Sequence, residues 1–125
     1  LNPAHVRAHL AFVAGAFLQG FGQNEAATGR FERAVQAEQG NAQYWLGEAF
    51  YDRKDYAKAL AEFRVAVDKY PHGNKVPDAL LKVGYCYLAL GQAEKGRFAL
   101  EQVVTIYPKT EPALLAGKRL ETIPR

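Results

Sequence analysis

The chain has 125 residues, of which 49% are hydrophobic and 23% are charged. This length predicts a single domain, and this hydrophobic content is enough to bury a core, which excludes an intrinsically disordered chain. Sixteen basic and thirteen acidic residues leave a net charge of only +3. Because the charge is mild and no run of five like charges occurs, the sequence argues against nucleic-acid binding.

The longest uninterrupted hydrophobic run, residues 10–18 when Gly15 is counted, is too short to cross a lipid bilayer, which takes roughly 20 residues. The chain starts with Leu rather than Met and no signal peptide precedes it, so we expect a fragment or a processed form. The single cysteine, Cys86, cannot form an internal disulfide. It lies in a hydrophobic helical segment and is predicted to be buried and unreactive.

Helical periodicity and end signals predict seven helices and no strands. Asn2 and Pro3 form a favourable start for the first helix, and Gly20 and Gly22 form a turn after it. We do not interpret this glycine pair as a phosphate-binding loop, because a third glycine and a preceding strand are missing. The predicted helices, in chain order, are residues 3–19, 24–37, 41–53, 56–69, 76–90, 93–106 and 111–122.

The boundary between the second and third predicted helices is marked only by Gly40 and Asn41, an end signal followed by a start signal. We expect two separate helices here. No proline occurs between Asn24 and Asp52, however, so the alternative is one long helix. Such a helix would send the first hairpin onto a neighbouring chain as a domain swap.

Capping and helix-breaking residues mark the later boundaries. Asp55 and Thr110 are predicted N-caps, and Gly91 is predicted to end the helix before it. The last helix has no partner after it and is expected to cover the preceding hairpin as a terminal cap. Its predicted inward residues are Leu114, Leu120 and Ile123, and its predicted solvent-facing residues are Lys118, Arg119 and Glu121.

One hairpin pattern occurs three times. In the central copy, residues 43–71, a Leu-Gly pair precedes an aromatic residue on the first helix, and an Ala-x3-Phe motif precedes Pro71 on the second. Corresponding positions recur 37 residues later and, except for the proline, 32 residues earlier. This order resembles the tetratricopeptide (TPR) repeat, which has a period of about 34 residues. The small residues Gly47 and Ala59 are expected where the two helices cross closely.

The predicted fold is therefore an all-α TPR superhelix of three helix-turn-helix repeats plus a C-terminal capping helix. One such hairpin cannot bury its own hydrophobic face, so the copies are expected to stack as a single domain. The predicted repeats cover about residues 8–39, 40–76 and 77–110, and the capping helix covers about residues 111–122.

No catalytic arrangement can be assembled from these residues. His5 and His9 stand four residues apart, a spacing that can hold a metal ion, but no third ligand accompanies them, so we predict two surface histidines. Glu48 and Asp52 have the same spacing and are better explained as solvated or ligand-facing charges than as paired acids. We predict no enzyme activity, no metal and no cofactor.

The first helices of stacked TPR repeats line a concave groove, which is the predicted binding surface for a protein or peptide. Tyr44, Tyr51 and Tyr85 are the predicted anchors, because tyrosine offers a flat apolar face and a hydroxyl at little entropic cost. Glu48 and Asp52 are expected to favour a basic partner. The alternative for each tyrosine is packing between neighbouring repeats. The predicted groove residues are Asn41, Tyr44, Glu48, Tyr51, Asp52, Asp78, Leu81, Tyr85 and Leu88, with His9, Phe12 and Gln19 in the first repeat.

From about residue 41 to residue 123, the chain resembles the C-terminal TPR domain of the Tol-Pal system proteins called YbgF or CpoB. The shared features are Tyr44-Trp45-Leu46-Gly47, Leu81-Lys82-Val83-Gly84, the longer loop after Tyr70-Pro71, the second Tyr107-Pro108 and the closing Lys118-Arg119-Leu120. The resemblance implies a non-catalytic periplasmic scaffold that binds TolA and links outer-membrane constriction to peptidoglycan synthesis in cell division. It also implies a signal peptide and a trimerising coiled coil upstream, neither of which is in this chain.

Two other functions remain open at this point. One is another envelope TPR protein, of the lipoprotein type that serves outer-membrane protein assembly. The other is a self-association module whose groove is filled by a neighbouring copy. The expected partners are in every case proteins or peptides, without nucleic acid and without direct membrane insertion. The chain itself is expected to be a monomer or a domain-swapped oligomer.

Overall fold

The computed structural model describes residues 24–124, and this part of the chain is helical without a strand. The helices are α2 (Asn24–Asp52), α3 (Tyr56–Lys69), α4 (Val76–Ala89), α5 (Ala93–Ile106) and α6 (Glu111–Glu121). The first predicted helix, its glycine turn and the first-repeat residues His5, His9, Phe12 and Gln19 lie outside the described residues.

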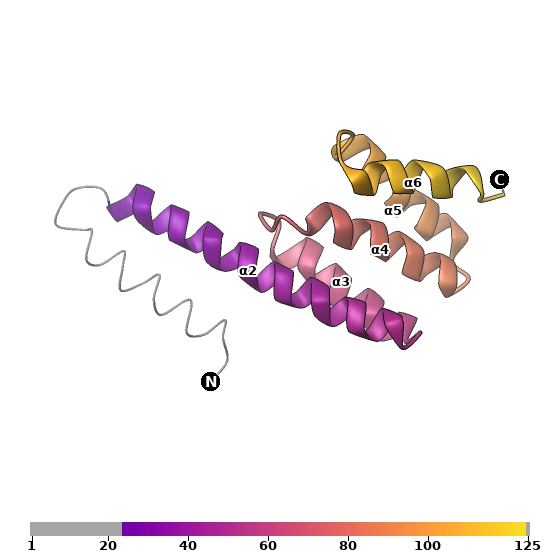
Figure 1. Cartoon of the computed structure of the whole chain (residues 1–125), viewed down its shortest axis with the longest axis horizontal. Coiled ribbons are helices and arrows are strands. Elements are labelled where there is room, and N and C mark those ends of the chain that lie inside the picture. Colours follow the sequence, from indigo (N-terminus) through magenta and orange to yellow (C-terminus); the bar gives the residue numbers. More distant parts are fainter. Residues whose placement is uncertain (1–23, 125) are drawn as a thin grey trace.

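The helices stack in chain order, each packed against the next, so that α2 contacts α3, α3 contacts α4, α4 contacts α5 and α5 contacts α6 (Figure 1). In addition, α4 touches both α2 and α6. The described helices therefore form two layers, with α2, α4 and α6 in one and α3 and α5 in the other. This alternation is the all-α arrangement of TPR repeats that the sequence predicts.

The expectation of separate helices on either side of Gly40 is wrong, because α2 runs without a break for 29 residues. The N-terminal part of α2 projects beyond the other helices, and only its C-terminal part lies against α3 (Figure 1). The physical reason is that Gln39 stands where the other repeats have a proline, so the backbone hydrogen bonds continue through Gly40. Gly40 itself is buried, and a Cβ added at this position would lie only 3.1 Å from Tyr70 Cβ.

Glycines lie where the paired helices cross. A Cβ at Gly47 would stand 2.6 Å from the ring of Phe63, and a Cβ at Gly84 would stand 2.6 Å from Leu100 Cδ2. Ala59, on the opposite helix from Gly47, is fully buried. The prediction that small residues permit close crossing is therefore confirmed, since a larger side chain would force the helices apart.

Two predicted N-caps are confirmed. The Asp55 carboxylate accepts a hydrogen bond from the Lys58 backbone N–H at 3.3 Å, and the Thr110 hydroxyl accepts one from the Ala113 N–H at 3.2 Å. The predicted stop at Gly91 is also confirmed, because this residue has φ +78° just after α4. Lys54 holds the corresponding turn after α2 at φ 60°, a conformation that glycine adopts with less strain.

The last helix, α6, covers α5 as expected, but one of its predicted inward residues points elsewhere. Ile123 is buried and Leu120 is half-buried, whereas Leu114 is 59% exposed. The contact face of α6 passes through the buried Ala113 and Ala116. Leu114 lies one position, about 100° of helix rotation, away from Ala113 and falls outside this face.

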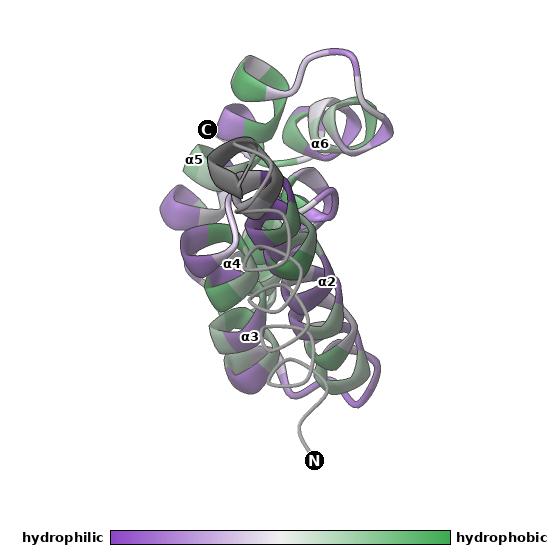
Figure 2. Cartoon of the chain, turned by 90° about the vertical axis from the view of Figure 1, so that its left-hand side faces the viewer, coloured by the Kyte–Doolittle hydropathy of each residue, from purple (hydrophilic) through white to green (hydrophobic). Residues whose placement is uncertain are grey.

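The core consists of side chains from both layers. Its largest fully buried members are Phe63, Leu100, Val103 and Cys86. Burial raises the pKa of the Cys86 thiol to about 12, which keeps it protonated at neutral pH. Figure 2 shows that each helix carries both hydrophobic and hydrophilic residues around its circumference, as amphipathic packing requires. Within residues 24–124, none of the helices combines the length and the hydrophobicity needed to cross a bilayer.

Candidate partner-binding groove

The layer formed by α2, α4 and α6 contains a pocket of about 290 Å³. Tyr51 contributes to it from α2, Tyr85 and Leu88 from α4, and Arg119 from α6. Three helices that are far apart in sequence therefore supply one concave surface with two phenol rings, an aliphatic side chain and a cation. Three of these four residues are among the predicted groove residues.

Lys82 links α2 to α4 beside this pocket. Its Nζ lies 3.1 Å from Glu48 Oε1, 4.4 Å from the centroid of the Tyr51 ring and 5.9 Å from that of Tyr85. The ammonium group thus forms an ion pair and stands over both aromatic faces, which fixes the two tyrosines relative to each other. Because Glu48 is matched by Lys82, its carboxylate adds little to the attraction for a basic partner that the sequence suggested, and this role falls to the exposed Asp52.

Tyr44 is not an open groove residue. Its side chain is only 7% exposed, and its ring packs against Phe63 with a centroid distance of 5.6 Å. Burial, with smaller contributions from Glu48 and Asp78, raises the pKa of Tyr44 to about 12. The prediction of Tyr44 as a partner anchor is therefore wrong, because its ring is buried against α3 of its own predicted repeat. Leu81 is likewise buried in the core.

The other predicted groove residues keep some accessible surface. Tyr51 and Tyr85 are half-buried, and burial raises the pKa of each phenol. The ring of Tyr51 also meets that of Tyr56 edge to face at 5.3 Å, which fixes its orientation. Both phenols stay protonated at neutral pH and can act as hydrogen-bond donors. The remaining positions are half-buried at Asn41, Glu48, Asp78 and Leu88 and exposed at Asp52.

Arg119 is a groove residue that the sequence reasoning missed. It was predicted to point into solvent, and it is exposed, but it also borders the pocket. Its charge opposes the effect of burial on the pKa of Tyr85, and its guanidinium donates a hydrogen bond to Thr122 Oγ1. The spacing of Gly84 and Gly117 places α6 in the same layer as α4, but at this offset Arg119 corresponds to the buried Cys86, so the sequence carries no specific signal for it.

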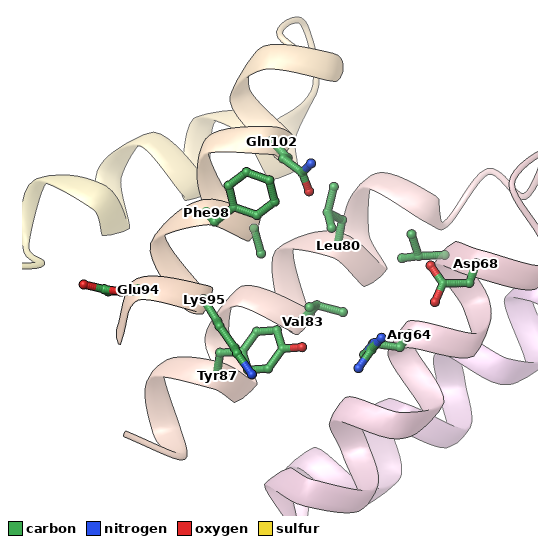
Figure 3. Close-up of a pocket in the computed structure, with 11 residues that line it drawn as sticks. Arg64, Asp68, Leu80, Val83, Tyr87, Glu94, Lys95, Phe98 and Gln102 are labelled. Carbon is green, nitrogen blue, oxygen red and sulfur yellow. The ribbon is translucent and has the colours of Figure 1, made fainter. Parts of the chain in front are cut away.

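A second and larger pocket, of about 410 Å³, lies on the opposite side of α4, between α3 and α5. Its floor consists of Leu80, Val83 and Tyr87 from α4. Figure 3 shows Phe98 and Lys95 on one side of it. Arg64 and Asp68 stand on the other. The sequence reasoning did not predict this pocket, because it considered only the concave surface.

The side chains that could bind a metal ion are dispersed in the part of the chain that the structure describes. Within residues 24–124, no three His, Cys, Asp or Glu side chains lie together as a potential metal site. Glu48 and Asp52 are not paired with each other, since Glu48 contacts Lys82 and Asp52 is exposed. The predicted histidine pair near the N-terminus lies outside the described residues.

Comparison with known proteins agrees with this architecture. Residues 18–74 and residues 78–110 each match a family model described as tetratricopeptide repeat. The chain is also similar to the RNA polymerase-associated protein CTR9 of Caenorhabditis elegans, with 27% identity over 92 residues that cover 72% of this chain and 8% of that protein. The chain thus spans a small part of this relative's length. The helical stack and the two family-model matches show that the chain carries a tetratricopeptide repeat domain. This helical repeat serves as a protein–protein interaction scaffold.

Proposed function

We propose that this domain is a non-catalytic scaffold of the Tol-Pal system in the periplasm, where it binds a segment of TolA and coordinates outer-membrane constriction with peptidoglycan synthesis during cell division. The sequence resemblance over about residues 41–123 supports this assignment. The single observation that carries the binding role is the concave pocket in which Tyr51, Tyr85 and Arg119 meet from three helices.

The pocket suits an extended polypeptide. Two fixed phenol rings offer apolar area without a large loss of conformational entropy, and their hydroxyls can bond to a peptide backbone. Arg119 adds a positive charge at one end, which suits a carboxylate, while Asp52 stays exposed on α2 and suits a basic group. A partner segment that carries both charges would be held in one direction.

The test is calorimetric titration of the chain with recombinant TolA. We expect Tyr85→Ala to weaken binding at least about tenfold, because a half-buried aromatic residue in the centre of an interface typically contributes 1–3 kcal/mol or more. Phe98→Ala is the matched control, since Phe98 is an aromatic residue 62% exposed beside the pocket on the other side of α4. It should leave the dissociation constant nearly unchanged.

Two results would contradict the proposal. One is the absence of heat on titration with TolA although the chain is folded by circular dichroism. The other is the reverse order of effects, with Phe98→Ala weakening binding more than Tyr85→Ala, which would move the partner to the pocket between α3 and α5.

A further inference from the structure

One side of α2 carries hydrophobic side chains that no other helix in residues 24–124 covers. Phe31, Trp45 and Leu46 are 39%, 57% and 44% exposed, and Ala42 and Ala49 are also exposed. With 100° of rotation per residue, these five positions lie within one stripe along the helix. A hydrophobic stripe of this length that the other described helices leave exposed indicates an interaction surface.

The next repeat shows what normally covers this stripe. Leu46 corresponds to Val83 at the 37-residue offset, and Val83 is only 6% exposed. The difference is the preceding helix, α3, which packs against α4 and places Val67 beside the same pocket as Val83. At the 32-residue offset, Val67 corresponds to Val35. In a regular repeat stack, Val35 would therefore be the side chain that packs against Leu46 and covers it.

Val35 cannot reach Leu46 within one chain. Both residues belong to the continuous helix α2, eleven positions apart, which places their Cα atoms about 16 Å apart along the axis and on the same side of the helix. A second α2 running antiparallel brings Val35 of each copy onto Leu46 of the other. The two-fold axis of such a pair passes near Gly40 and Asn41, midway between the two positions, so that both contacts form together.

We propose that two copies of this chain pair through this stripe, with the α2 helices antiparallel. Each copy supplies the N-terminal part of its α2 in place of the helix that would precede α2 in a regular repeat stack, which is an exchange of identical elements. Within residues 24–124, no other helix lies against the projecting part of α2 (Figure 1). Tyr51 lies about 140° around α2 from Leu46, so the pairing leaves the concave pocket accessible and is independent of the proposed function.

The direct test is disulfide trapping in the full chain. After mild oxidation, the double variant Val35→Cys/Leu46→Cys should run mostly as a covalent dimer on a non-reducing gel. A disulfide within one chain is excluded, because its Cα atoms must lie within about 7 Å and these are about 16 Å apart. The native Cys86 is buried and does not compete. An equimolar mixture of the two single variants should give the same dimer, and each single variant alone should give little, because like residues are also about 16 Å apart in an antiparallel pair.

Light scattering provides the independent measurement. The unmodified chain should have a molar mass in solution of twice the 13.8 kDa of one copy. The Leu46→Lys variant should have the molar mass of a single copy. The control variant Leu114→Lys places the same charge at an exposed leucine on α6. It should keep the molar mass of a dimer. A single-copy mass for the unmodified chain would overturn the proposal. So would trapping of Leu46→Cys alone as efficiently as the double variant, which would mean a parallel arrangement.

Discussion

Phe63→Ala is expected to lower the free energy of unfolding by about 3–5 kcal/mol, the typical effect of removing a fully buried phenylalanine. The ring of Phe63 is inaccessible to solvent, lies against Gly47 at the helix crossing and contacts the rings of Tyr44 and Tyr51. Its loss leaves a cavity that the surrounding rings cannot fill without moving α2 relative to α3. Urea denaturation followed by circular dichroism measures the change.

The control for this variant is Phe98→Ala, which removes the same atoms from a side chain that is 62% exposed. We expect a loss below about 1 kcal/mol, because most of this surface is already in contact with water. Equal losses for the two variants would show that α2 and α3 are not packed through Phe63.

The second large effect is expected at the crossing of α4 and α5, where Gly84→Val should cost about 2–3 kcal/mol. A Cβ at Gly84 would stand 2.6 Å from Leu100 Cδ2 and 3.3 Å from the backbone oxygen of Gly96. Leu100 is fully buried, so its side chain can move aside only by displacing its neighbours. Overpacking of this kind outweighs the gain of up to about 1 kcal/mol from replacing a helical glycine.

Gly117→Ala is the matched control for Gly84→Val. Gly117 occupies the corresponding place on α6, 33 residues later, but a Cβ there would have no atom within 4 Å. This substitution should therefore raise the free energy of unfolding by about 0.5–1 kcal/mol, the usual benefit of alanine over glycine in a helix. A loss of stability at Gly117 would contradict the open surface seen on α6, and a neutral Gly84→Val would contradict the close crossing.

The sequence predicts most of the fold because local signals and repeat signals agree in its C-terminal two thirds. The bounds of α3 and α5 coincide with the predicted ones, since a capping side chain or a left-handed turn precedes each helix and a Tyr-Pro pair follows it. The prediction failed at Gly40 and Asn41, which were taken as a helix end followed by a helix start. A glycine weakens a helix by only about 1 kcal/mol, and packing against Tyr70 offsets this cost.

The binding groove was predictable as a face of the fold but not residue by residue. The repeat register places Tyr44, Tyr51 and Tyr85 on the same layer, yet it does not say that Tyr44 would turn onto Phe63. Nor does it show that Lys82 would neutralise Glu48, because both depend on side-chain packing between helices. Such details require the relative placement of α2 and α4, which the sequence pattern leaves undetermined.

The most direct test of the account is chemical-shift mapping of the isotope-labelled chain on addition of a TolA segment. Binding in the concave groove predicts that the largest shifts occur at the amides of Tyr51, Tyr85, Leu88 and Arg119, with those around Phe98 unchanged. Shifts that gather on α3 and α5, or a spectrum that does not change at saturating TolA, would contradict the assignment of the concave layer as the binding surface.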